Sequence, residues 1–313
     1  MGYGKKSWRE WVIEDEETVL GLLKKAYDSG IRTFDTADMY SEGQSEVLIG
    51  KFLPRYNINR STVTILTKCF NKTADDPSLE DTEVNWINRH GLSRKHIMDA
   101  VEASVVRLGT YIDVLQIHRY DKDTPREETM EALHDAVKSG KVRYIGASSM
   151  RAIEFAQLQF VAEKHGWTKF ISMQNFYNLV YREEEREMIP FCRETGVGII
   201  PWSPIARGVL ARPANESSLR EETDPLLKRQ NFKADEASLE IIRRVEKVAN
   251  DHNVSMAIIS IAWVISKGCA PIVGFNKPER IDEAINALKL DLSQDEIRYL
   301  EEPYLPRQVE QYL

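Results

Sequence analysis

The feature that most constrains this chain is a repeated alternation of segments with helical periodicity and short apolar runs. Apolar residues recur at helical spacing over residues 17–29, just before the apolar run 31–34. The same order returns further along, where Ser93 and Gly109 bound a helix that precedes residues 112–117. Short, continuously apolar strands that alternate with helices are typical of parallel sheets covered on both faces. We therefore predict an α/β fold, either a doubly wound sheet or a closed barrel.

Seven strands can be counted, each after a helix, at residues 31–34, 63–67, 112–117, 142–145, 170–173, 198–201 and 272–274. A (β/α)8 barrel needs eight strands. The segment Met1–Gly4 is typical of a loop that follows a strand, so the first strand is expected to be missing from this sequence. Residues 206–233 show scattered charge and no period, which predicts a long loop over one barrel mouth. Because no linker divides the chain, residues 1–313 are predicted to form a single domain.

Composition excludes several classes of function. The chain has 42 Lys and Arg residues against 49 Asp and Glu residues, a formal charge of -7, so no basic surface favours nucleic acid or an anionic membrane. The longest apolar run is far shorter than the ~20 residues of a membrane-spanning helix. Three widely spaced cysteines and six histidines show no metal-binding spacing. We expect a cytoplasmic protein with no metal ion, acting on a small molecule.

Four residues whose side chains could take part in catalysis follow three consecutive predicted strands. Asp35 and Tyr40 follow the first, Lys68 follows the second and His118 follows the third. In parallel α/β proteins the carboxyl ends of the strands carry the chemistry. Each residue alone could be part of the scaffold, but four such groups on one rim favour a catalytic site.

The chemistry of this quartet suits reduction of a carbonyl group. An adjacent ammonium favours the phenolate form of a tyrosine, so Lys68 could make Tyr40 a proton donor. Asp35 is the anion placed to keep Lys68 charged. His118 can donate a hydrogen bond to a carbonyl oxygen. A proton delivered to that oxygen completes a reduction in which the carbon receives a hydride, which requires a hydride-carrying cofactor.

Later strand ends carry groups that could hold such a cofactor. The GxGxxG fingerprint and the P-loop are absent, which argues against a Rossmann domain and an ATP enzyme. Hydroxyl, amide and indole groups suited to a nicotinamide occur at strand ends, namely Ser148, Ser149, Gln174 and Trp202. After Gly274, a helix begins with Lys277 and Arg280, an arrangement that suits the 2′-phosphate of NADP.

Several segments resemble the aldo-keto reductase superfamily. Residues 34–40, with Gly43, Ser45 and Glu46, are similar to its first signature, and Lys68 and His118 complete its Asp/Tyr/Lys/His tetrad. Residues 142–149, 174–178 and 201–208 are similar to its cofactor segments, so the resemblance covers nearly the whole chain. Residues 89–97 and 301–304 resemble the fungal branch of aryl-alcohol dehydrogenases and versiconal hemiacetal acetate reductases.

The resemblance implies a (β/α)8 TIM barrel, NADPH/NADP+ as cofactor, and reduction of aldehydes or ketones, with aromatic or medium-chain aldehydes as the expected substrates. Tyr40 would donate the proton, Lys68 and Asp35 would adjust the acidity of Tyr40, and His118 would orient the carbonyl. The expected cofactor-binding residues are Ser148, Ser149, Gln174, Trp202, Ser203, Arg207, Gly208, Gly274, Lys277, Arg280 and Glu283. Many members have Asn in place of Ser149. Residues 70–91 and 206–233 would line the substrate pocket, with Phe70 and Trp86 as walls.

Three alternatives stay open beside a working reductase. Members of this branch carry an amino-terminal hairpin and a first strand that this sequence lacks, so a truncated, less stable and catalytically impaired reductase is one. A non-catalytic nucleotide-sensing subunit, similar to potassium-channel β subunits, is another. A Schiff-base aldolase that uses Lys68 is disfavoured, because Asp35 would keep the amine protonated.

Overall fold

The computed structural model describes residues 1–74, 78 and 82–310. These residues divide into two compact units. Unit 1 contains Met1–Trp8 and Val12–Met173, and unit 2 contains Arg9–Trp11 and Gln174–Glu310. The organisation of residues 1–313 as one domain stays a prediction.

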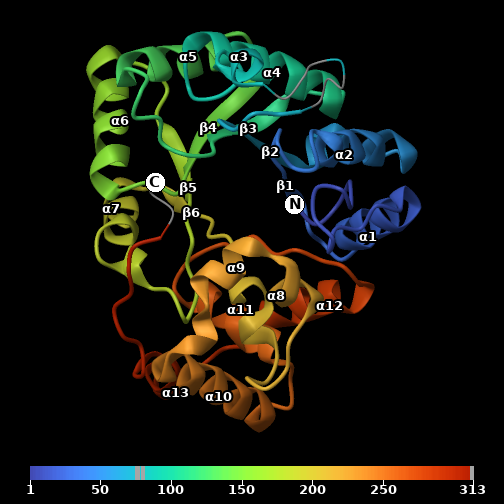
Figure 1. Cartoon of the computed structure of the whole chain (residues 1–313), viewed down its shortest axis with the longest axis vertical. Helices are drawn as coiled ribbons and strands as arrows, with labels where there is room; N and C mark the ends of the chain where they lie inside the picture. The colour runs from blue at the N-terminus through green and yellow to red at the C-terminus, as the bar shows by residue number, and fades with distance from the viewer. Residues whose placement is uncertain (75–77, 79–81, 311–313) are drawn as a thin grey trace. The chain divides into compact units, whose positions relative to one another are not determined.

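Unit 1 is a parallel sheet lined by helices. Its strands lie side by side in chain order, and they are β1 (Thr33–Asp35), β2 (Thr64–Cys69), β3 (Ile112–Ile117), β4 (Val142–Ser148) and β5 (Phe170–Gln174), whose last residue belongs to unit 2. The register pairs Lys68 with Gln116 and Ile117 with Ala147. The helices are α1 (Glu16–Asp28), α2 (Gln44–Arg55), η1 (Arg60–Thr62), α3 (Glu83–Trp86), α4 (Arg94–Leu108), α5 (Arg126–Lys138) and α6 (Ala152–His165). Figure 1 shows these elements in blue to green.

The helices of unit 1 begin and end close to the predicted residues. Asp15 caps α1 by accepting a hydrogen bond from the Thr18 amide at 2.8 Å. Ser93 caps α4 by accepting one from the His96 amide at 3.3 Å, and the helix ends at Gly109 as predicted. These caps satisfy amides that a helix leaves without a partner in its first turn.

Helices α2 and α4 cross at a glycine. A Cβ atom on Gly50 would lie 2.6 Å from the carbonyl oxygen of Arg107, closer than real Cβ contacts allow. At the same crossing, Arg107 Nε lies 2.6 Å from the buried Glu46 Oε2. The close approach of the two backbones therefore brings an arginine of one helix onto a carboxylate of the other.

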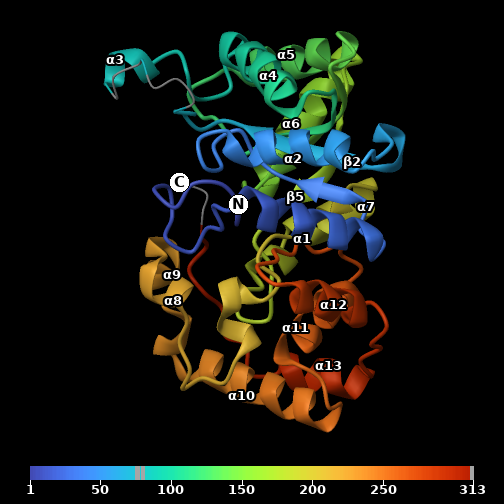
Figure 2. The ribbon, with the colours of Figure 1, turned by 90° about the vertical axis from the view of Figure 1, so that its right-hand side faces the viewer.

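Unit 2 is mainly helical. Its elements are η2 (Glu183–Glu185), α7 (Met188–Thr195), β6 (Gly198–Ile199), η3 (Ala206–Ala211), α8 (Leu219–Thr223), α9 (Pro225–Gln230), η4 (Phe232–Ala234), α10 (Glu236–Asp251), α11 (Met256–Ser266), α12 (Pro278–Ala287) and α13 (Gln294–Glu301). Figure 2 shows α10 to α13 in orange to red. Helix α11 is apolar and buried along nearly its whole length, and α10 and α12 pack against it.

Among the described residues, no single helix is both long and apolar enough to cross a membrane. Helices α10 and α11 have the length and composition only when taken together, and a bend of 101° separates them.

The seventh predicted strand, residues 272–274, is not a strand in the structure. Ile272 forms a single parallel bridge with Trp202, and its amide donates to the Pro201 carbonyl at 2.8 Å. Proline lacks an N–H group, so Pro201 cannot donate a ladder hydrogen bond to this segment. The described part of the chain therefore contains six strands, and β6 itself is shorter than the predicted residues 198–201.

The prediction of an irregular loop over residues 206–233 is also wrong. The segment contains η3, α8 and α9, and η4 begins within it. Ser218 caps α8, and Asp224 caps α9, whose first turn contains Pro225. Proline and a capping carboxylate are typical of helix starts. Each helix is too short to show a helical period, which is why pattern reading missed them.

Candidate active site

The predicted quartet Asp35, Tyr40, Lys68 and His118 lies together in unit 1. Asp35 ends β1, Lys68 lies in β2, and His118 follows β3. The ladder continues past the strands, because the His118 amide donates to the Cys69 carbonyl at 2.9 Å. Parallel pairing therefore brings these side chains to the carboxyl edge of adjacent strands, as the sequence predicted.

Lys68 and Asp35 form a buried ion pair. Lys68 Nζ lies 2.6 Å from Asp35 Oδ2, and the two side chains are 1% and 7% exposed. Lys68 Nζ also donates to the Thr36 carbonyl at 2.8 Å, while Asp35 Oδ1 accepts from Gln116 Nε2 at 2.9 Å. Burial alone would lower the pKa of Lys68, but Asp35 and Tyr40 together outweigh it, so the pKa is raised. Lys68 is therefore cationic at neutral pH.

Tyr40 is surrounded by a cation and two aromatic rings. Lys68 Nζ lies 5.2 Å from the centroid of the Tyr40 ring, and a hydrogen bond between the two side chains helps to raise the pKa of Lys68. The His118 ring meets Tyr40 edge-on at 5.7 Å, and the Trp8 ring lies at 6.0 Å. Sequence reasoning missed Trp8. The available signal was a large aromatic residue within the charged segment that begins at Lys5.

His118 is held in its neutral form. Burial, Arg119 and Lys68 lower its pKa well below the usual value of 6.5. Asn71 Nδ2 lies 3.4 Å from His118 Nδ1. A neutral imidazole carries one N–H donor and one acceptor nitrogen, so His118 can donate a hydrogen bond near Tyr40 without carrying charge.

A second buried group of polar residues lies beside the quartet. Asp38 donates its amide to the Lys68 carbonyl at 3.1 Å, and burial followed by Glu46 raises the pKa of the Asp38 carboxyl well above its usual value. Glu46 is fully buried against Arg107 and also accepts from Thr67. The sequence pointed to Glu46 only through the family signature, and Asp38 and Arg107 were missed as members of this group.

Two predicted cofactor residues, Ser148 and Ser149, lie in unit 1 at the end of β4. Both are almost fully buried, and Ser149 has a positive φ of 39°. Such backbone conformations are strained for a residue with a side chain, and strained residues cluster at functional sites. Gly146 lies just before them, and a Cβ atom there would lie 2.6 Å from Ser172 Oγ.

Gln174 and Trp202 lie in unit 2, where three chain segments meet. Trp202 forms parallel bridges with Phe176 and Ile272, and its amide donates to the Asn175 carbonyl at 2.9 Å. The Trp202 ring stacks on Phe176 with centroids 4.4 Å apart and planes at 19°. Trp202 is therefore an aromatic plane backed by Phe176, a residue that the sequence did not single out for this role.

Residues 203–208 form a strained turn after Trp202. Positive φ values occur at Ser203, Ala206, Arg207 and Gly208. The Arg207 guanidinium is buried against Asp224, with Nη1 to Oδ2 at 2.7 Å, and Arg207 Nε has no hydrogen-bond partner among the described residues. Burial would raise the pKa of Asp224, but Arg207 and Arg220 lower it. The sequence missed this partner of Arg207.

The remaining predicted cofactor residues lie around the start of α12. Lys277 is its N-cap residue and does not cap it with a side-chain hydrogen bond, and Pro278 is in the first turn. Arg280 Nη1 pairs with Glu283 Oε2 at 2.7 Å. Gly274 lies in the segment that leads to this helix. Helix starts attract anions, and the two cations strengthen that attraction.

Each unit by itself contains buried polar groups of the kind that can bind part of a dinucleotide cofactor. Buried polar side chains lie at the strand ends, and the donor Arg207 Nε and the acceptor Asn175 Oδ1 lack partners among the described residues. Buried polar atoms of this kind are costly unless a partner is supplied. In the described part of the chain, no group of three or more His, Cys, Asp or Glu residues could hold a metal ion.

The chain belongs to the aldo/keto reductase family, whose family model matches residues 1–304. The predicted (β/α)8 class of fold and the predicted family are thereby confirmed. Its relatives include versiconal hemiacetal acetate reductase of Aspergillus parasiticus, 55% identical over 322 residues, covering 99% of this chain and 93% of the relative. A protein named "Putative aryl-alcohol dehydrogenase AAD16", from Saccharomyces cerevisiae, is 54% identical over 315 residues, covering 98% of this chain and 92% of that protein. These relatives bear out the predicted fungal branch, and the chain is an oxidoreductase of this family.

Proposed function

We propose that this protein is an NADPH-dependent reductase that converts aldehyde or ketone carbonyls to alcohols, with aromatic or medium-chain aldehydes as substrates. The observation that carries the proposal is the buried Lys68–Asp35 pair in contact with Tyr40, with His118 beside the same phenol. The names of the relatives, a hemiacetal acetate reductase and an aryl-alcohol dehydrogenase, support the substrate class.

Each member of the quartet has a separate task. Tyr40 donates its phenolic proton to the carbonyl oxygen, and the cationic Lys68 stabilises the phenolate that forms. Asp35 keeps Lys68 charged and fixes its position. The neutral His118 donates a hydrogen bond to the same carbonyl oxygen and orients the substrate. The reduced nicotinamide, when bound, supplies the hydride.

The cofactor would be held by the other predicted residues. Trp202 offers a plane for the nicotinamide ring, and Ser148, Ser149 and Gln174 offer partners for its carboxamide. Ser203, Arg207 and Gly208 would bind the diphosphate. Gly274, Lys277, Arg280 and Glu283 would surround the adenosine, and the two cations favour NADP over NAD.

The test is the rate of NADPH consumption with a panel of aldehydes. Tyr40→Phe keeps the ring that contacts Trp8 and His118 but removes the proton, so we expect turnover to fall by ~10²- to 10⁴-fold while NADPH still binds. Tyr144→Phe is a matched control, because Tyr144 is 54% exposed on β4. Turnover retained in Tyr40→Phe would refute the assignment.

The same assay separates the alternatives. NADPH binding without turnover by the unmodified protein would favour a nucleotide-sensing subunit. The raised pKa of Lys68 counts against a Schiff-base mechanism, which needs the free amine. Weak turnover that still depends on Tyr40 would indicate an impaired reductase.

A further inference from the structure

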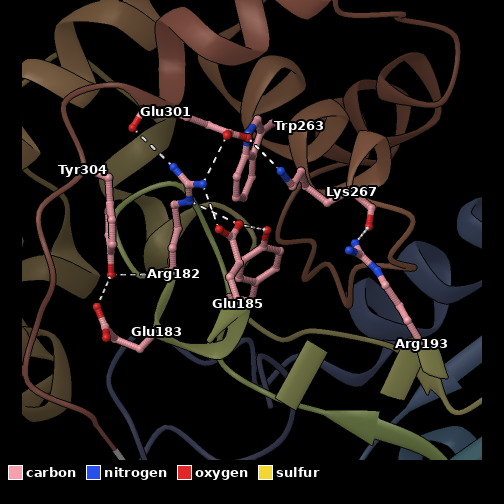
Figure 3. Close-up of polar contacts among 9 residues, drawn as sticks. Arg182, Glu183, Glu185, Arg193, Trp263, Lys267, Glu301 and Tyr304 are labelled. Atoms are coloured by element: carbon pink, nitrogen blue, oxygen red, sulfur yellow. Dashed lines mark hydrogen bonds and ion pairs between the residues drawn. The ribbon is translucent and has the colours of Figure 1, made fainter. Parts of the chain in front are cut away.

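The chain continues beyond α13 as residues 302–310, which we call the carboxyl-terminal strap. It contains neither strand nor helix beyond Glu301 and contacts several elements of unit 2. Tyr304 is its first anchor. The Tyr304 hydroxyl donates to Glu183 Oε1 at 2.7 Å and accepts from the Arg182 amide at 2.9 Å. Figure 3 shows Tyr304 between these two residues.

Arg307 is the second anchor. Its amide donates to Glu183 Oε1 at 2.8 Å, and its guanidinium pairs with Asp235 and donates to Ser238 Oγ at 2.8 Å. The same guanidinium lies 4.9 Å from the centroid of the Phe232 ring. Arg307 therefore joins η2, the start of α10 and η4. Beyond it, the Glu310 amide donates to the Tyr181 hydroxyl at 3.0 Å.

Three rings lie at or beside the residues that the strap contacts, and we call them the aromatic stack: Trp202, Phe176 and Tyr181. Phe176 lies between the other two, with centroids 4.4 Å from Trp202 and 4.7 Å from Tyr181. Phe232 contacts Phe176 from a third direction at 6.2 Å. Phe176, Tyr181 and Phe232 are almost fully buried, whereas Trp202 is partly exposed. The strap thus contacts Tyr181 and Phe232, and both of these contact the ring that backs Trp202.

Glu183 connects the strap to the aromatic stack, because two of its hydrogen-bond donors belong to the strap. Burial would raise the pKa of its carboxyl, but hydrogen bonds from Arg307, Tyr304 and Arg186 lower it, so Glu183 is ionised. Two of those three donors belong to the strap, and the third, Arg186, has a side chain that is 60% exposed. A buried carboxylate that loses its donors is costly and forces its surroundings to move. Tyr181 lies only two residues before Glu183.

We propose that Tyr304 and Arg307 are positioning residues, which act through Glu183 and Phe232 on the aromatic stack and so set the orientation of Trp202. This inference rests on the proposed function, in which Trp202 supports the nicotinamide ring. Packed interiors transmit displacements because they contain few voids. Residues of the strap that do not touch the cofactor would therefore control how tightly NADPH binds.

The test uses the full chain labelled with 5-fluorotryptophan. The sequence has six tryptophans, and Trp202→Phe assigns the Trp202 resonance by its disappearance from the ¹⁹F spectrum. In ligand-free Arg307→Leu we expect the Trp202 resonance to shift or broaden while that of Trp167, in unit 1, stays in place. We expect the dissociation constant and the KM for NADPH to rise about tenfold, with a smaller change in kcat.

Two variants serve as controls for Arg307→Leu. Arg307→Lys keeps a cation beside Asp235 and Phe232 and should restore part of the affinity. Arg298→Leu removes an arginine whose side chain is 74% exposed on α13, and it should change neither the Trp202 resonance nor NADPH binding. If Arg307→Leu does not fold, Tyr304→Phe is measured in its place. This variant loses the two hydrogen bonds of the Tyr304 hydroxyl and keeps the ring.

An unchanged Trp202 resonance with unchanged NADPH affinity in a folded Arg307→Leu or Tyr304→Phe variant would overturn the inference. The ligand-free spectrum keeps this outcome distinct from a failure of the proposed function. A moved Trp202 resonance in a protein that does not bind NADPH would support the coupling and refute the cofactor assignment.

Discussion

The ammonium of Lys68 lies 2.6 Å from the carboxylate of Asp35, and the two side chains come from adjacent strands with almost no exposure to solvent. A buried ion pair costs much desolvation energy and often stabilises a fold no more than apolar residues would. The pair is therefore explained better by what it does to Tyr40 than by stability.

The two roles of this pair can be separated by a double substitution. Lys68→Met leaves the Asp35 carboxylate buried without its cation, and we expect it to lower the free energy of unfolding by ~3–5 kcal/mol. Lys68→Met with Asp35→Asn removes both charges and should recover most of that loss in urea unfolding. NADPH consumption should stay abolished in the double variant. Recovered turnover there would show that the pair serves only the fold.

His118 predicts how stability depends on pH. Its folded pKa lies well below 6.5, mainly because of burial, so below that pH the unfolded chain binds more protons than the native state. The free energy of unfolding should therefore fall as pH falls below about 6.5, by up to ~1.4 kcal/mol per pH unit from this group. His96, whose pKa burial also lowers, acts in the same direction.

Urea midpoints at about pH 7.5 and about pH 5.5 measure this effect. His118→Gln should show a smaller loss of stability on acidification than the unmodified protein. His165→Gln is a control because His165 is exposed. An equal loss of stability in His118→Gln would contradict the prediction.

The start of α13 predicts a stability change remote from the site. The Ser293 amide and hydroxyl donate to Glu296 Oε2 at 2.8 and 2.7 Å, and the Glu296 amide donates back to Ser293 Oγ at 3.2 Å. Ser293→Ala should lower the free energy of unfolding by ~1 kcal/mol, because one helix amide loses its cap. Turnover per folded molecule should not change, and lost turnover would argue against a purely structural cap.

The same cap predicts behaviour in acid. Hydrogen bonds from Ser293 and the contact with His252 lower the pKa of Glu296 from 4.5 to about 2. A carboxyl with a lowered folded pKa contributes stability above its unfolded pKa and loses it as pH falls toward the folded pKa. Glu296→Gln should therefore destabilise the protein at neutral pH and have little effect near pH 2, as followed by thermal unfolding. An effect independent of pH would contradict this explanation.

Gly146 links the sheet to the quartet. A Cβ atom there would lie 2.6 Å from Ser172 Oγ and 3.1 Å from Gln116 Cγ, and Gln116 holds Asp35 Oδ1. We expect Gly146→Ala to cost ~1–3 kcal/mol in unfolding free energy through overpacking and to reduce turnover. Adding Ser172→Ala removes the nearest atom and should restore part of both. A stable, fully active Gly146→Ala variant would contradict this prediction.

The sequence predicted the regular parts of the fold because each strand and helix carries its own local signal. Ser93 and Gly109 bound α4 as predicted, and the predicted residues 112–117 coincide with β3. The prediction of short elements failed for a physical reason. Helices α8 and α9 are too short to show a helical period, and Pro201 cannot donate a hydrogen bond to the expected last strand.

The quartet could be predicted because parallel strands bring their carboxyl ends together, so chain order alone places the four side chains on one edge. The residues that support the predicted site residues could not be predicted in this way. Trp8 and Asn71 approach Tyr40 and His118 from loops, and Asp224 reaches Arg207 from a short helix. Loop conformations depend on packing at a distance that no local pattern records.

The crossing of α2 and α4 at Gly50 shows that the buried polar groups beside the quartet also depend on how the helices pack. A single methyl group at this position would act as a wedge between the two helices and draw Arg107 away from the carboxylate that it neutralises. The buried Glu46 would then lose its ion-pair partner, and the buried Asp38, on which both Glu46 and Arg107 act, would lose a nearby cation. A position with no side chain, outside the sheet, is thus needed for the Arg107–Glu46 ion pair beside the quartet.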